Sequence, residues 1–179
     1  MTIQDELDEC HEFLKTLKEL CSEIHFIKGN HEDRLRRFLW QNPSLASIKA
    51  LELPKLLNLD LLEISYHEYE YILNGFRFTH GSIVRQDSGA SAKAELLKYG
   101  SNLSHGHTHR LGSYLKTDSR GVTGAYEMGC LCGLNPEYIS GIPNWQQGFG
   151  VFHFEGDRFF CQQVPIIDHK FIYGGKKYE

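Results

Sequence analysis

Three short segments of this chain combine residues that suit metal or phosphate chemistry. Gly29-Asn30-His31-Glu32 follows a short apolar run, His80 stands just before Gly81, and Gly106-His107-Thr108-His109 follows another apolar run. Amide oxygens and imidazoles are ligands that suit divalent zinc, manganese, iron or nickel. The pattern therefore predicts a loop-built site for one or two divalent metal ions.

The His-x-His spacing adds a further expectation. If the loop stays extended, His107 and His109 are expected to serve two neighbouring ions rather than to chelate one. Each motif also has a structural alternative, because Asn30 is a good helix N-cap and a His-x-His segment is often only a polar turn. His105 precedes this motif and is expected to be a buried strand residue.

The predicted elements place these residues at the ends of strands. Asn74-Gly75 between two apolar runs is the strongest local signal for a β-hairpin. That turn pairs Leu73 with Phe76 and puts His80 at the end of the outgoing strand. The sequence also predicts helices at 2–20, 33–41 and 89–99, short helical turns over 44–62 and a hairpin over 64–80. The other predicted strands are 23–28, 101–105, 111–117, 124–132, 149–154 and 158–164. The terminal segment GGKKYE is expected to fray.

Composition narrows the class of protein. The chain has 179 residues, 41% of them hydrophobic, and a net charge of −4, which favours a single folded domain over 1–179 and gives no basic surface for nucleic acid or anionic membranes. No run approaches the roughly 20 apolar residues of a membrane helix. The five scattered cysteines indicate reduced thiols and a cytoplasmic location. Cys130-x-Cys132 is expected to be core, while Trp145 and Tyr138 are candidates to touch a base or sugar.

Taken together, Gly-Asn-His-Glu, the isolated His80 and Gly-His-Thr-His resemble the last three motifs of calcineurin-like metallophosphoesterases, in the same order. The resemblance implies an α/β fold, a two-sheet β-sandwich flanked by helices. It implies that one metal is bound by Asn30, His80 and His107, and a second by His109. It also implies that His31 binds phosphate and protonates the leaving oxygen.

The same resemblance implies that Glu32 orients His31. Arg34 and Arg37, one helical turn apart, are expected from their charge and spacing to help hold an anionic substrate. The family's first two motifs, D-x-H and G-D-x-x-D, do not occur in their expected upstream position. The first strands of the fold are therefore expected to be missing, and a second copy or an N-terminal partner fragment is expected to complete it.

The sequence favours two functions over a third, a purely structural zinc ion, because structural zinc sites are usually closed and cysteine-rich. The first is metal-dependent hydrolysis of a phosphomonoester or phosphodiester, with manganese, zinc, iron or nickel as cofactor and nucleic acid involved only as a substrate. The second is a degenerate, catalytically inactive relative that acts as a metal-binding or protein-interaction module. The missing upstream motifs favour the second, and the intact downstream motifs favour the first.

Overall fold

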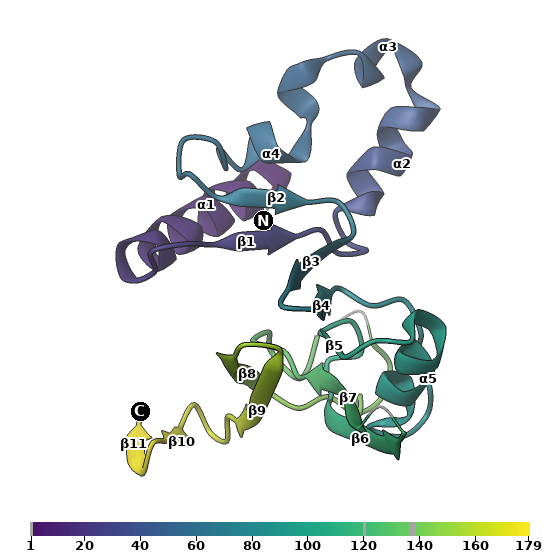
Figure 1. Ribbon diagram of the computed structural model, residues 1–179. Helices are drawn as coiled ribbons and strands as arrows, with labels where there is room; N and C mark the ends of the chain where they lie inside the picture. Colours follow the sequence, from purple (N-terminus) through teal and green to yellow (C-terminus); the bar gives the residue numbers. More distant parts are fainter. Residues whose placement is uncertain (1, 120, 137–138) are drawn as a thin grey trace. The chain divides into compact units, whose positions relative to one another are not determined.

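The computed structural model describes residues 2–119, 121–136 and 139–179. The fold is mixed α/β, and the chain forms two compact units, Met1–Tyr69 and Glu70–Glu179 (Figure 1). Within the described residues, no helix combines the length and the apolar character needed to cross a membrane. Tyr138, a candidate from the sequence, lies outside the described residues.

The first unit is built on helix α1 (Ile3–Leu20), which begins as predicted at Thr2. The Thr2 hydroxyl accepts a hydrogen bond from the Asp5 backbone N–H, and the Asp5 carboxylate accepts one from the Thr2 N–H, which is a capping box. One face of α1 buries Leu14 against Leu57 and Leu59. Burial of this apolar face, more than helix propensity, stabilises the helix.

Two short parallel strands complete the core of the first unit. β1 (His25–Ile27) pairs with β2 (Ser65–His67), and Phe26 and Tyr66 pack against the buried leucines. The segment between the strands contains α2 (Asp33–Gln41), α3 (Pro43–Ala46), the 3₁₀ turn η1 (Lys49–Leu51) and α4 (Leu53–Leu56), which confirms the predicted short helical turns.

The second unit contains a five-stranded sheet in the order β3-β4-β5-β7-β6. β4, β5 and β7 run parallel to one another, and the outer pairs β3–β4 and β6–β7 are antiparallel. The bounds of these strands are β3 (Glu70–Leu73), β4 (Phe76–Thr79), β5 (Leu103–His105), β6 (Leu111–Asp118) and β7 (Gly121–Met128). Three parallel strands therefore bring their carboxyl ends to one edge of the sheet.

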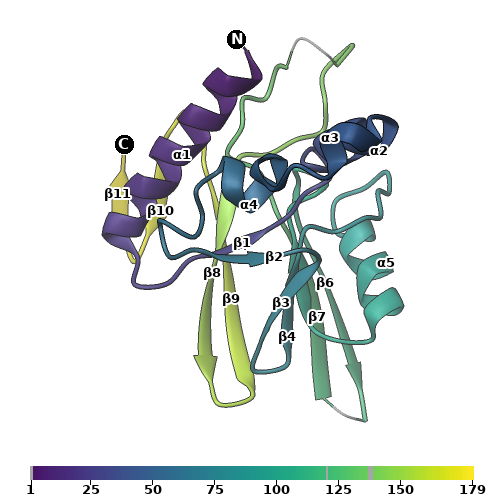
Figure 2. The same cartoon turned by 90° about the horizontal axis from the view of Figure 1, so that it is seen from above.

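The two faces of this sheet are covered by different elements (Figure 2). Helix α5 (Ala90–Tyr99) buries Ala92 and Leu96 against Leu103 and Ala125 of the sheet. On the other face, Phe76 meets aromatic rings of the hairpin formed by β8 (Gly148–Glu155) and β9 (Arg158–Pro165). Alternation along each strand produces this division, because neighbouring side chains point to opposite faces.

The hairpin at Asn74-Gly75 is confirmed, including the pairing of Leu73 with Phe76. Both turn residues have positive φ, as a type I′ turn requires. The incoming strand is shorter than predicted, however. Residues 65–67 leave it and pair with β1 instead, so that the expected single strand divides into β2 and β3.

Two further expectations about strands need correction. β7 covers Gly121–Met128 rather than 124–132, because its pairing with β6 extends as far as Asp118 and Gly121. The C-terminal segment is a hairpin rather than a frayed end, formed by β10 (Phe171–Tyr173) and β11 (Lys176–Tyr178). Gly174 and Gly175 supply the two positive φ angles of its turn, and the Phe171 and Tyr178 rings stack at 4.8 Å.

Candidate metal centre

Two of the predicted ligands, His80 and His107, face each other in the second unit. They follow β4 and β5, whose parallel pairing aligns Thr79 with His105. The backbone N–H of His107 donates to the carbonyl of His80 at 2.9 Å, which fixes the two loops to each other. The side-chain nitrogens His80 Nε2 and His107 Nδ1 lie 3.0 Å apart. The sheet topology thus brings together two imidazoles from segments 27 residues apart.

His109 is directed to different neighbours. Its backbone N–H donates to the Gly106 carbonyl at 3.1 Å, so the Gly-His-Thr-His loop is a turn and not the extended segment considered from the sequence. His109 has a φ of 57°, a left-handed conformation that is uncommon for residues other than glycine. Its ring meets Trp145 edge-on at a centroid distance of 4.3 Å. The turn, rather than strand alternation, therefore decides where the His109 imidazole lies.

The predicted core position of the Cys-x-Cys pair is wrong. Cys130 is half-buried, but Cys132 is exposed, and its Sγ lies 3.9 Å from Nδ1 of His109. Burial, together with a hydrogen bond to Cys132, raises the pKa of the Cys130 thiol to about 12. Sequence spacing did not suggest this neighbourhood. The structure explains it by the parallel pairing of β5 with β7, which places the loops after both strands at one edge of the sheet.

A buried polar layer lies beneath the histidine loops. Glu95, His105 and Glu127 are all 2% exposed or less, so the expected burial of His105 is confirmed. Glu95 Oε1 accepts hydrogen bonds from the backbone N–H groups of Ser82 and Ile83 at 2.6 and 2.8 Å. Burial lowers the pKa of His105, which favours its neutral form. This layer holds the segment after His80 in place through its backbone.

Gly81 is required by the same packing. Its φ is +92°, and a Cβ at this position would lie 2.8 Å from Nδ1 of the buried His105. A side chain would therefore both strain the backbone and displace the imidazole. The glycine after His80 in the sequence has a physical reason: it allows the loop to lie directly on the buried layer.

The other predicted site residues belong to the first unit. Asn30, His31 and Glu32 form the turn between β1 and α2, as the sequence predicted. The Glu32 carboxylate accepts a hydrogen bond from the Gly29 backbone N–H at 2.8 Å, and the His31 carbonyl accepts one from the Arg34 N–H. These local bonds define the turn and leave the His31 side chain at the surface.

The exposed pair Arg34 and Arg37 lies on α2, whereas Arg36 between them makes ion pairs. Arg36 bonds to Glu68 at 3.0 Å and to Asp33 at 3.0 Å. Lys28 also pairs with Asp33 and Glu68. Hydrogen bonding to Lys28 holds the pKa of Asp33 below its usual range. This network joins β1, α2 and the end of β2, and so supports the turn that carries Asn30.

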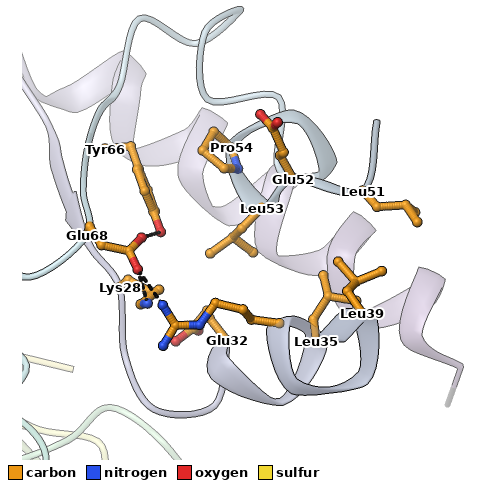
Figure 3. Close-up of a pocket in the computed structure, with 11 residues that line it drawn as sticks. Lys28, Glu32, Leu35, Leu39, Leu51, Glu52, Leu53, Pro54, Tyr66 and Glu68 are labelled. Carbon is orange, nitrogen blue, oxygen red and sulfur yellow. Dashed lines mark hydrogen bonds and ion pairs between the residues drawn. The ribbon is translucent and has the colours of Figure 1, made fainter. Parts of the chain in front are cut away.

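The network also lines a cavity of about 320 Å³ in the first unit (Figure 3). Tyr66 donates to Glu68 at 2.8 Å at one end, while Leu35, Leu39 and Leu53 form apolar walls. Burial alone would raise the pKa of Glu68, but hydrogen bonds from Lys28 and Tyr66 hold it below its usual range. The charged groups at this end of the cavity thus pair with one another.

Comparison with known proteins relates this chain to phage proteins. It is 27% identical over 194 aligned residues to the "Gene 54 protein" of Mycobacterium phage L5, covering 99% of this chain and 75% of that protein. It is 28% identical over 165 residues to the "Gene 54 protein" of Mycobacterium phage D29, covering 85% of this chain and 65% of that protein. No family model matches the chain, and no solved structure matches it.

Proposed function

We propose that this chain is a metal-dependent phosphoesterase that hydrolyses phosphomonoesters or phosphodiesters, and that its fold is of the metallophosphoesterase type. One observation carries the proposal: His80 and His107 lie with ring nitrogens 3.0 Å apart at the carboxyl edge of parallel strands. Ligand and catalytic sites of α/β sheets commonly lie at that edge. The strand-end position and the chain order of these histidines match the motifs of the family that the sequence resembles.

The distance between the two imidazoles fits a shared metal ion. Zinc–nitrogen bonds of about 2.0–2.1 Å at angles between roughly 90° and 110° place two ligand nitrogens about 2.9–3.4 Å apart. The 3.0 Å separation of His80 Nε2 and His107 Nδ1 lies in this range. In this proposal these two residues hold the ion.

Each remaining residue has one proposed task. A bound divalent metal supplies charge neutralisation and an activated water for phosphate-ester hydrolysis. His31, at the surface of its turn, binds a phosphate oxygen and donates a proton to the leaving oxygen, for which an imidazole is suited near neutral pH. Glu32 limits the conformations of that turn through its bond to Gly29. Arg34 and Arg37 attract the anionic substrate.

The test is hydrolysis of p-nitrophenyl phosphate and of bis(p-nitrophenyl) phosphate by the full chain, with Mn²⁺ or Zn²⁺ added. We expect metal-dependent turnover that falls at least about 100-fold in His107→Ala. Loss of this ligand weakens the binding of the metal ion, whose charge neutralises the phosphate and activates water. His153→Ala is the matched control, because His153 is exposed on β8 and its loss should leave the rate unchanged.

Two results would refute this function. The first is no turnover with any divalent metal in a preparation whose circular dichroism shows it to be folded. The second is equal activity of His107→Ala and His153→Ala. The first result would favour a degenerate relative that binds metal or protein without catalysis, and the second would mean that the measured activity does not depend on His107.

A further inference from the structure

Three potential metal ligands form a cluster that does not include His80 or His107. One ligand atom each of His109, Cys130 and Cys132 lies within 4.8 Å of the other two. The cluster joins two loops, the turn after β5 and the segment after β7. From this geometry we propose that His109, Cys130 and Cys132 form a zinc site with two thiolates and one imidazole.

The spacing of the ligand atoms is close to that of a zinc site. With zinc–sulfur bonds of about 2.3 Å and zinc–nitrogen bonds of about 2.0–2.1 Å, a tetrahedral ion places sulfur and nitrogen about 3.5 Å apart and two sulfurs about 3.8 Å apart. His109 Nδ1 and Cys132 Sγ are 3.9 Å apart. Side-chain movements of a few tenths of an ångström to about one ångström suffice to bring all three atoms into position.

The backbone around the cluster is held by hydrogen bonds between its loops. The N–H of Gln146 donates to the His109 carbonyl at 2.8 Å, and the N–H of Cys130 donates to the Gln146 carbonyl at 3.1 Å. The Gln147 side chain donates to the Cys132 carbonyl at 2.8 Å. The segment at 146–147 therefore bridges both ligand-bearing loops. Such a frame lowers the entropic cost of assembling the three ligands around an ion.

His109 is itself held in an orientation suited to the cluster. Its left-handed backbone is a strained conformation of the kind found at functional sites. The edge of its ring meets Trp145, which limits rotation of the imidazole. Three protein ligands leave a fourth zinc position for water or substrate, as in catalytic rather than structural zinc sites.

The chemistry of the donors selects the metal. Thiolates are soft ligands that favour Zn²⁺ over Mn²⁺ and Mg²⁺. The two thiolates also carry negative charge that offsets the charge of the metal ion. His80 and His107, in contrast, are uncharged when they bind a metal. This zinc site uses His109, which the resemblance assigns to a second metal, but it rests on its own geometry and is tested by binding rather than by hydrolysis.

The experiment uses Co²⁺ as a spectroscopic substitute for Zn²⁺ in the full, reduced chain. Cobalt bound to thiolate gives a charge-transfer absorption in the near ultraviolet. We expect one equivalent of this signal, its displacement by Zn²⁺, and its loss in Cys132→Ser. Cys132 is exposed, so this variant should fold. The apparent Zn²⁺ affinity of Cys132→Ser should fall at least about 100-fold, the upper end of what loss of a supporting residue alone causes.

Two controls separate this site from its surroundings. Cys21→Ser removes an exposed cysteine of the first unit and should leave the signal unchanged. His107→Ala should also leave it unchanged while abolishing hydrolysis, so the zinc site and the proposed function succeed or fail separately. The proposal is overturned if no thiolate signal forms, if it persists in folded Cys132→Ser, or if Cys21→Ser removes it.

Discussion

The aromatic cluster around Phe76 of β4 allows a sharp test of what stabilises the second unit, in which His80 follows that strand. Phe76 is 1% exposed, and its ring lies 4.7 Å from Phe159, 4.9 Å from Phe78 and 4.9 Å from Phe152, measured between centroids. It therefore joins β4, which ends one residue before His80, to the β8–β9 hairpin. Phe76→Ala would remove one of the largest buried side chains of the unit.

The expected cost can be worked out from this environment. Deletion of a buried phenylalanine side chain typically costs about 3–5 kcal/mol, from lost transfer energy and the cavity left behind. Three close aromatic partners, each contributing about 0.5–1.5 kcal/mol beyond burial, place Phe76 toward the upper part of that range. A folded domain has only about 5–15 kcal/mol of total stability, so we expect a loss of about 4 kcal/mol to be close to the limit that the unit tolerates.

The assay is urea unfolding followed by tryptophan fluorescence. The chain has two tryptophans, Trp40 in the first unit and Trp145 in the second, so a Trp40→Phe background reports on the second unit alone. Phe160→Ala is the matched control, because Phe160 is the neighbour of Phe159 on β9 but is 60% exposed. We expect that control to change stability by less than about 1 kcal/mol. Phe76 does not have this role in the unit if Phe76→Ala costs less than about 1 kcal/mol, or if both variants cost the same.

Two further predictions concern packing and pH. Gly112→Ala should destabilise the second unit by about 1–3 kcal/mol, because the added Cβ would collide with the Gly89 backbone and lie 2.8 Å from Glu127 Oε2. Gly133→Ala is the control: its added Cβ would meet nothing within 4 Å, so its stability in the same unfolding assay should be nearly unchanged. Burial lowers the pKa of His67 in the folded state, so the unfolded chain takes up a proton more readily below its ordinary pKa, about 6.5. Stability should therefore fall as the pH drops through this ordinary value toward the lower pKa of the folded state. This fall should be smaller in His67→Gln; an equal fall in both proteins, measured by thermal unfolding, would contradict the assignment.

Local signals in the sequence were sufficient for many elements of the fold. Helix α1 begins at Thr2 because the capping side chains are adjacent in sequence, and the Asn74-Gly75 hairpin forms because its turn residues accept positive φ. Helix α2 covers 33–41 as expected. In each case the determining interactions join residues a few positions apart, so the local sequence is sufficient to predict the element.

Tertiary pairing decided what the local signals left open. Residues 65–67 read as part of one long strand, yet they pair with β1, 40 residues away in the chain. No local pattern ranks the two possible pairings of residues 65–67, because the free energy of the β1–β2 pair comes from a partner distant in sequence. The C-terminal hairpin was missed for another reason: its Gly174-Gly175 turn and the stacked rings of Phe171 and Tyr178 are local features that the expectation of a frayed end did not take into account.

The candidate metal centre divides in the same way. Residue types, spacing and chain order in the sequence by themselves determined that Asn30, His80, His107 and His109 were the candidate ligands. Only the parallel arrangement of β4, β5 and β7 decided that His80 meets His107 and that Cys132 lies beside His109. The physical reason is that parallel strands bring their carboxyl ends to one edge of a sheet, so residues from separate segments become neighbours through backbone hydrogen bonding that no single segment encodes.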